Sequence, residues 1–175
     1  MAGLKHVLGS LTLGGYDRSR FTPNAHSFSF APDREGELLV GVQQIEYASS
    51  KVNKSSLLSK GIRANVDSTT PYIYLPLEAC EAFEKAFNLE YNETMELYPV
   101  SASLHADLIA QNASITFVLG DDTSAGETVN ITLPYDSFDL TAESPVVGDN
   151  TMFFPLKRAI NETQYTLGRT FLQEA

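Results

Sequence analysis

Asp67 is the side chain best placed for acid–base chemistry. It follows the alternating apolar run 62–66, and three hydroxyl residues come directly after it. An apolar strand of this kind carries a carboxylate to the end of a sheet, where hydroxyls and backbone N–H groups can hold it ionised and oriented. The pattern allows a catalytic carboxylate at Asp67, with Ser68 and Thr70 as supporting hydrogen-bond donors. Taken alone, it indicates an ordinary aspartate in a strand-ending turn.

The sequence contains no motif for a metal site, a serine nucleophile or a phosphate-binding loop. The three histidines, His6, His26 and His105, lie far apart without metal-ligand spacing, and Cys80 is the single cysteine. A zinc site is therefore not expected. No G-x-S-x-G motif and no phosphate-binding glycine loop occur. We expect neither a metal nor a cofactor, and we expect Cys80 to be a buried structural thiol.

The charge balance limits the partners. The 175 residues carry a formal net charge of −10, and the basic residues are scattered singly. Such a chain would be repelled by a phosphate backbone, so we expect no nucleic-acid partner. No apolar run approaches the roughly 20 residues that span a bilayer, so no membrane segment is expected in this chain.

Glycosylation sequons are more frequent than chance predicts. The pattern N-x-S/T occurs at five of the nine asparagines: Asn53, Asn92, Asn112, Asn130 and Asn161. Sequons in this number favour a protein that passes through the secretory pathway to the outside of the cell or its surface. The first residues do not form a signal peptide. We therefore expect the chain to be a piece of a larger secreted or surface protein.

Hydrophobic periodicity predicts a mostly β domain. Alternating or apolar runs separated by turn residues indicate short strands, and one stretch after Pro76 has helical spacing. The expected strands cover 10–13, 38–47, 62–66, 115–119 and 129–133, the last two as a hairpin, and the expected helices cover 76–88 and, as a minor one, 104–110.

Several segments, in order, resemble the second lobe of pepsin-like aspartic peptidases. Gly9 to Asp17 is similar to the glycine-rich segment that leads into that lobe, and Asp67 to Thr70 takes the place of its Asp-Thr/Ser-Gly-Thr/Ser motif. Thr166 to Leu172 resembles the segment that crosses beside the catalytic loop. The resemblance implies one lobe of the double-ψ β-barrel acid-protease fold over 1–175, with the N-terminal lobe and the final strand absent. The residues at 75–80 and 168–175 resemble those of a divergent filamentous-fungal branch of the family.

Two positions depart from the family pattern. Thr69 replaces the glycine that lets the backbone pass close to the catalytic pair, and a β-branched residue is stiff at such a place. Arg169 stands where the family usually has aspartate.

The resemblance implies a two-aspartate mechanism, of which this chain holds one half. The first hypothesis is a lobe that is catalytically silent alone, as a fragment or part of a pseudo-peptidase. The second is an active endopeptidase whose other lobe or partner chain supplies the second aspartate. The third is a symmetric dimer in which two copies of Asp67 meet. The implied partners are the missing N-terminal lobe, a peptide substrate, and further copies of the chain through an open sheet edge.

Overall fold

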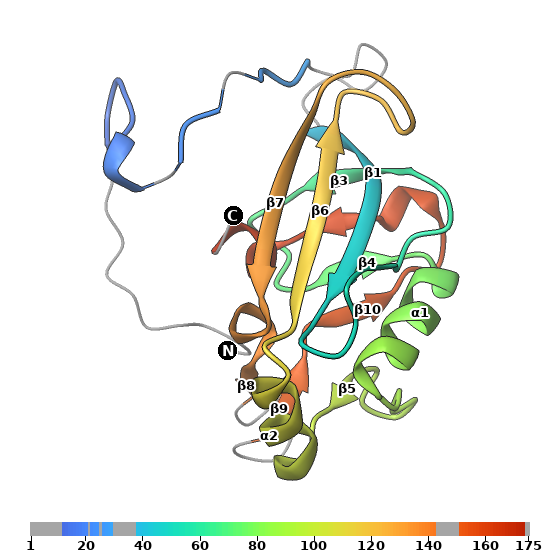
Figure 1. The fold of residues 1–175 in the computed structure, drawn as a ribbon. Coiled ribbons are helices and arrows are strands. Elements are labelled where there is room, and N and C mark those ends of the chain that lie inside the picture. Colours follow the sequence, from blue (N-terminus) through green and yellow to red (C-terminus); the bar gives the residue numbers. More distant parts are fainter. Residues whose placement is uncertain (1–11, 21, 25, 30–37, 143–150, 174–175) are drawn as a thin grey trace.

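The computed structural model describes residues 12–20, 22–24, 26–29, 38–142 and 151–173. Its largest part is an eight-stranded mixed sheet in the order β10-β4-β11-β3-β1-β6-β7, with β2 paired to β1 (Figure 1). The strands are β1 (Leu39–Ala48), β2 (Ser55–Ser56), β3 (Ile62–Val66), β4 (Ile73–Leu75), β6 (Ser114–Gly120), β7 (Thr128–Pro134), β10 (Leu156–Arg158) and β11 (Thr166–Leu167).

The long strands follow the expected pattern. In β6 the inward-facing Ile115, Phe117 and Leu119 are buried and alternate with less buried residues. β6 pairs with β7 in an antiparallel hairpin from Ser114↔Pro134 to Gly120↔Thr128. The predicted strand 38–47 and the predicted hairpin are thus confirmed, each to within one or two residues.

On the other side of the sheet, a strand from the end of the chain pairs between two strands from its first half. β11 lies between β3 and β4, parallel to the first and antiparallel to the second. The chain from β3 to β4 therefore runs around the end of β11. This is the ψ arrangement that the family resemblance implies, and it places Asp67 in the connecting loop.

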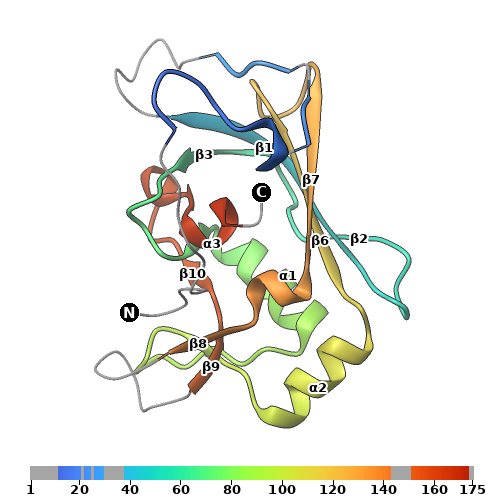
Figure 2. The same cartoon turned by 90° about the vertical axis from the view of Figure 1, so that its left-hand side faces the viewer.

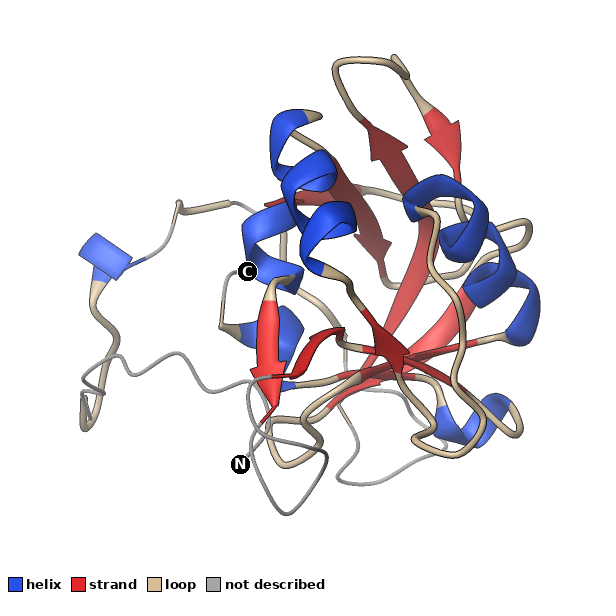
Figure 3. Cartoon of the chain, turned by 90° about the horizontal axis from the view of Figure 1, so that it is seen from below, coloured by secondary structure: helices blue, strands red, loops and turns tan. Residues whose placement is uncertain are grey.

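A small sheet extends the fold at the other end of the molecule. It has the order β5-β9-β8, formed by β5 (Tyr98–Pro99), β8 (Leu140–Ala142) and β9 (Thr151–Phe154). Seen after a quarter turn, these strands and α2 lie at one end, away from β3 (Figure 2). Viewed from below, strands run through the middle and helices lie around them (Figure 3).

The main helix, α1 (Leu77–Phe87), confirms the prediction for 76–88. Pro76 stands at its N-cap, and Asn88 ends it in the left-handed conformation with φ 53°. Its buried face is formed by Ala79, Cys80, Phe83 and Phe87.

An aromatic cluster joins this helix to the small sheet. The Phe154 ring lies 5.1 Å from Phe87 and 5.1 Å from Phe138, stacked on the latter. All of these side chains are almost completely buried. The cluster places Phe154 of the small sheet and Phe138 after β7 in the same hydrophobic core as α1, whereas Leu140, Ala142 and Phe153 of the small sheet form a second cluster with Leu97.

Three details differ from the prediction. The minor helix α2 (Ala102–Ala110) begins two residues early, because the Ser101 hydroxyl accepts a 3.2 Å hydrogen bond from the Leu104 amide and caps it. A short third helix, α3 (Arg169–Leu172), follows β11. The predicted strand 10–13 is wrong for Thr12 and Leu13, which lie in no strand; Leu13 is 84% exposed. Ser10 and Leu11 lie outside the described residues.

Candidate functional site

The Asp67 carboxylate is held by donors from its own loop. Oδ1 accepts hydrogen bonds from the Thr69 amide at 2.8 Å and from the Thr69 hydroxyl at 2.7 Å. Oδ2 accepts one from the Thr70 hydroxyl at 2.6 Å. Charge-assisted bonds of this length stabilise an ionised carboxylate and fix its orientation.

These bonds lower the pKa of Asp67 from its ordinary 3.8 to about 2. The largest contribution comes from the Thr70 hydroxyl, followed by the hydroxyl and amide of Thr69. Partial desolvation opposes them weakly. Asp67 is therefore ionised at any pH above about 3.

Strand β11 and the start of α3 form hydrogen bonds with the loop that contains Asp67. The Asp67 amide donates to the Leu167 carbonyl at 3.2 Å, and the Arg169 amide donates to the Thr70 carbonyl at 2.7 Å. The Thr170 hydroxyl donates to the Pro71 carbonyl at 2.8 Å. The predicted proximity of Asp67 to the Leu167–Gly168 segment is thus confirmed.

Gly168 is required by this crossing. A Cβ at this position would lie 2.2 Å from the Tyr72 carbonyl oxygen and 2.4 Å from that of Thr70. Both atoms belong to backbone, which cannot move aside as a flexible side chain would. The loop and the crossing segment are therefore in direct backbone contact, and only glycine fits between them.

Thr69 fits the position at which the family has glycine. Among the described residues, the non-glycine residues with positive φ are Asn88, Glu96 and Asn112, so Thr69 has an ordinary backbone conformation. Its hydroxyl and its amide both bind Asp67. The stiffness expected from its β-branch therefore causes no visible strain, and the substitution adds a donor.

Sequence reasoning assigned the supporting donors only in part. Thr70 donates as predicted, whereas Ser68 is exposed and, in the described part of the chain, makes no hydrogen bond to Asp67. Thr69 takes that role and was missed. An aspartate that accepts from the amide and hydroxyl two positions later is a local turn pattern, and that spacing could have identified Thr69.

A second carboxylate does not reach Asp67 within the described residues. The groups that shift the pKa of Asp67 are hydroxyls and amides of Thr69 and Thr70. Arg169 is partly exposed at the start of α3, and no ion pair of the described residues includes it. The described part of the chain thus presents one ionised carboxylate at this loop, and no second carboxyl group faces it there.

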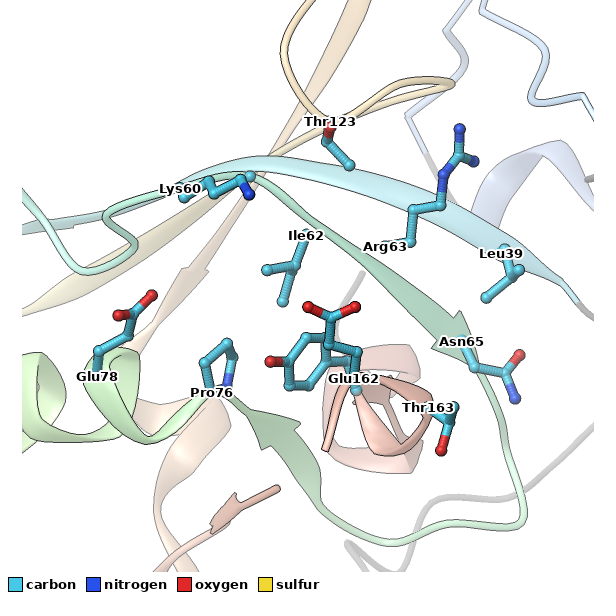
Figure 4. A pocket seen from close by; sticks show the side chains of 12 residues that line it. Leu39, Lys60, Ile62, Arg63, Asn65, Pro76, Glu78, Thr123, Glu162 and Thr163 are labelled. Carbon is cyan, nitrogen blue, oxygen red and sulfur yellow. The ribbon is translucent and has the colours of Figure 1, made fainter. Parts of the chain in front are cut away.

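A hollow of about 410 Å³ lies beside the same strand but does not contain Asp67 (Figure 4). Lys60 and Arg63 line one of its sides, and Glu78 and Glu162 come from α1 and from the short helix η3 (Glu162–Gln164). Asn65, two positions before Asp67, is its nearest residue in sequence to the loop. The hollow is therefore distinct from the Asp67 surface.

The sequons lie mostly at the surface. Asn53, Asn112, Asn130 and Asn161 are exposed, and Asn92 is partly buried. The side-chain oxygen Oδ1 of Asn161 accepts a hydrogen bond from the Thr163 hydroxyl at 2.6 Å, and Asn130 lies within β7.

Cys80 is buried next to backbone carbonyl oxygens. Burial raises the pKa of the Cys80 thiol to about 12, and its sulfur lies 3.6 Å from the Lys157 carbonyl oxygen, as expected for a structural thiol. His6 lies outside the described residues. In the part of the chain that is described, no three His, Cys, Asp or Glu side chains converge as a ligand set, and no helix is long and apolar enough to cross a membrane.

Comparison with known proteins identifies the family. The family model described as eukaryotic aspartyl protease matches residues 4–175. Among solved structures, the aspartic proteinase from Irpex lacteus matches with a TM-score of 0.57 and 13% identity, covering 91% of this chain. The chain spans 45% of the length of that structure. No curated protein matches significantly. With its mostly β fold, its ψ crossing and a family match along nearly its whole length, the chain belongs to the eukaryotic aspartyl protease family as a single pepsin-like lobe.

Proposed function

We propose that this chain is the C-terminal lobe of a pepsin-like aspartic endopeptidase homologue and is catalytically silent by itself. The observation that carries the proposal is the state of Asp67. Its carboxylate is oriented by three hydrogen bonds, its pKa is about 2, and no second carboxylate acts on it among the described residues.

Peptide hydrolysis by this family needs two carboxylates that share one proton across a water molecule. One takes a proton from the water and the other donates a proton to the peptide carbonyl, because their proximity separates their pKa values. Asp67 alone is a weak base, and no described residue stands opposite it as an acid that could donate a proton. General acid–base help is worth about 10²–10⁴-fold, so losing half of the pair together with the facing wall of a cleft leaves no measurable turnover.

An active endopeptidase is the second candidate, in which another lobe or chain supplies the second aspartate. The geometry of Asp67 favours this candidate over a purely structural role. The carboxylate is only partly buried, and a pKa of about 2 suits the ionised member of a carboxylate pair. A symmetric dimer with two facing Asp67 residues is a third arrangement, in which Thr69 would crowd the axis twice.

A cleavage assay in acid tests these candidates. The purified chain is incubated with an unfolded protein substrate at about pH 4, with and without pepstatin, beside the Asp67→Asn variant. We expect no cleavage from either protein. Cleavage by the wild-type chain that pepstatin blocks and Asp67→Asn abolishes would overturn the silent assignment. Sedimentation of the active species would then separate a dimer from a monomer.

We further propose that the parent protein is a secreted or cell-surface glycoprotein of fungal type. The five sequons support this, and four of them have exposed asparagines. In a secreting eukaryotic host, we expect glycans at several sequons, with Asn92 and Asn161 modified most and Asn130, within a strand, least. Mass spectrometry before and after glycosidase treatment checks this, with single Asn→Gln variants assigning each site. An unchanged mass would contradict it.

A further inference from the structure

The segment 26–29 lies against the turn of the β6–β7 hairpin. In both side views the blue N-terminal part of the chain reaches the tips of β6 and β7 (Figures 1 and 2). The Ser29 amide donates a 2.7 Å hydrogen bond to Asp121 Oδ1. We call residues 26–29 the strap and residues 121–127 the hairpin turn.

His26 is enclosed between two carboxylates of that turn. Its Nε2 lies 3.9 Å from Asp121 Oδ2, and its Nδ1 lies 3.7 Å from Glu127 Oε2. The Phe28 ring meets the imidazole edge-on at 4.7 Å. The His26 side chain is only 12% exposed, whereas Asp121 and Glu127 are 45% and 91% exposed.

The neutral imidazole is poorly satisfied in this position. His26 Nε2 is buried and has no hydrogen-bond partner among the described residues. A neutral ring has one N–H, and its other nitrogen is an acceptor that would face a carboxylate oxygen. The protonated ring carries an N–H toward each carboxylate, and at 3.9 and 3.7 Å it forms an ion pair with both Asp121 and Glu127. The surroundings therefore favour the strap in place when His26 is charged.

The hairpin turn is held in place by hydrogen bonds to β1, independently of the strap. Gln43, at the irregularity of β1, donates from Nε2 to the carbonyls of Asp122 and Ala125 at 3.1 and 2.8 Å. A Cβ at Gly41 would lie 2.1 Å from the Asp122 carbonyl oxygen, so the turn is in direct backbone contact with β1. A change at His26 is thus expected to move the strap and leave the turn in place.

Arg63 also contacts the hairpin turn. Arg63 donates to the Asp121 carbonyl at 3.4 Å and lies 4.0 Å from the Asp122 carboxylate. Asp121 and Glu127 are the two carboxylates within 4 Å of the imidazole among the described residues. Arg63 is thus engaged with Asp122 and the Asp121 backbone, and among the described residues it forms no ion pair with Asp121 or Glu127.

We propose that His26 is a pH-dependent latch, which fastens the strap to the hairpin turn when the imidazole is protonated and releases it when the imidazole is neutral. Histidine is the side chain that ordinarily changes charge between pH 5 and 8. The strap is therefore held more firmly by the charged imidazole than by the neutral one. This inference does not depend on peptidase activity.

Amide hydrogen exchange of the strap tests the latch. Wild type and His26→Gln are compared side by side at about pH 5.5 and pH 8, so that the intrinsic pH dependence of exchange cancels in their ratio. At the lower pH we expect exchange in residues 22–29 to be about threefold to fivefold slower in wild type, and at the higher pH a ratio near one.

Two neighbouring variants sharpen the test. Asp121→Asn keeps an acceptor for the Ser29 amide but removes the charge, and it should abolish the slower exchange at the lower pH. Asp122→Asn, one position along the same turn, should keep it. A wild-type to His26→Gln ratio that is equal at both pH values would overturn the proposal, and so would equal effects of the two aspartate variants.

Discussion

Asp67 and Asp121 each follow the end of a strand, but the hydrogen-bond donors to their carboxylates come from different parts of the chain. The donors to Asp67 come from the next three residues of its own loop. Asp121 accepts from Ser29, which is 92 positions away in the chain, and faces His26. The first carboxylate is organised by local backbone geometry, and the second by a distant segment.

This difference determines how each region responds to pH. Local hydroxyl and amide donors do not titrate, so Asp67 stays ionised and oriented throughout the mildly acidic range. A contact that depends on an imidazole changes with pH, as at the hairpin turn. The lobe thus combines a carboxylate that stays charged, Asp67, with a contact between the strap and the hairpin turn that depends on the charge of His26. The following experiments test this difference.

The largest effect is expected from Gly168→Ala. The new Cβ would meet two backbone carbonyl oxygens at 2.2 and 2.4 Å, so the loop and the crossing strand must separate. We expect a loss of about 3 kcal/mol in the free energy of unfolding, measured by urea denaturation. Gly15→Ala is the matched control, because nothing lies within 4 Å of its Cβ position. Equal stability of the two variants would contradict the direct backbone contact.

The pH dependence of stability is a second test. Folding lowers the pKa of Asp67 from 3.8 to about 2, so the ionised carboxylate stabilises the folded state above about pH 4. That contribution declines as the pH falls from 3.8 and is absent below about 2. Asp67→Asn should therefore be less stable than wild type at pH 6, and the difference should vanish near pH 2. A difference that stays constant with pH would exclude a lowered pKa.

Thr70→Val should raise the pKa of Asp67, because it removes the donor with the largest effect on that pKa. An NMR titration of the Asp67 carboxyl carbon would detect the rise from about 2 toward 3.8. Ser68→Ala removes a neighbouring exposed hydroxyl and should leave the pKa unchanged. A larger rise in Ser68→Ala than in Thr70→Val would show that the donors are misassigned.

The smallest effect expected is weak self-association of the isolated chain. Strand β7 is at the end of the sheet among the described strands, and an unpaired edge can pair with another copy. Sedimentation velocity over a range of concentrations should show oligomers, and Asn130→Lys on this edge should reduce them. A monomer at all concentrations would contradict the expectation.

Much of the fold could be read from the sequence. The alternation in β6 and the apolar spacing in α1 are local signals, and they predicted both elements within one or two residues. The strand expected at 10–13 failed for Thr12 and Leu13, because apolar alternation does not show whether a pairing partner exists. Helix α3 has four residues, too few for a periodic signal.

The site could be predicted less completely. The strand-ending position of Asp67 and the donor role of Thr70 followed from residue type and spacing. The role of Thr69 did not, because the family pattern assigned that position to glycine. The contact of His26 with the hairpin turn depends on residues 95 and 101 positions apart in the chain (121 − 26 and 127 − 26). No local pattern contains that information.

The ψ crossing also has a consequence for the order of folding. β11 belongs between β3 and β4, and Thr170 bonds to Pro71 across 99 positions of sequence. During synthesis, the place of β11 between these strands must remain empty until nearly all of the described chain has been made. Contacts of such long range form slowly, and the inner edges of β3 and β4 stay unpaired in the meantime. A chaperone that binds extended apolar segments would be most useful to this lobe during that interval.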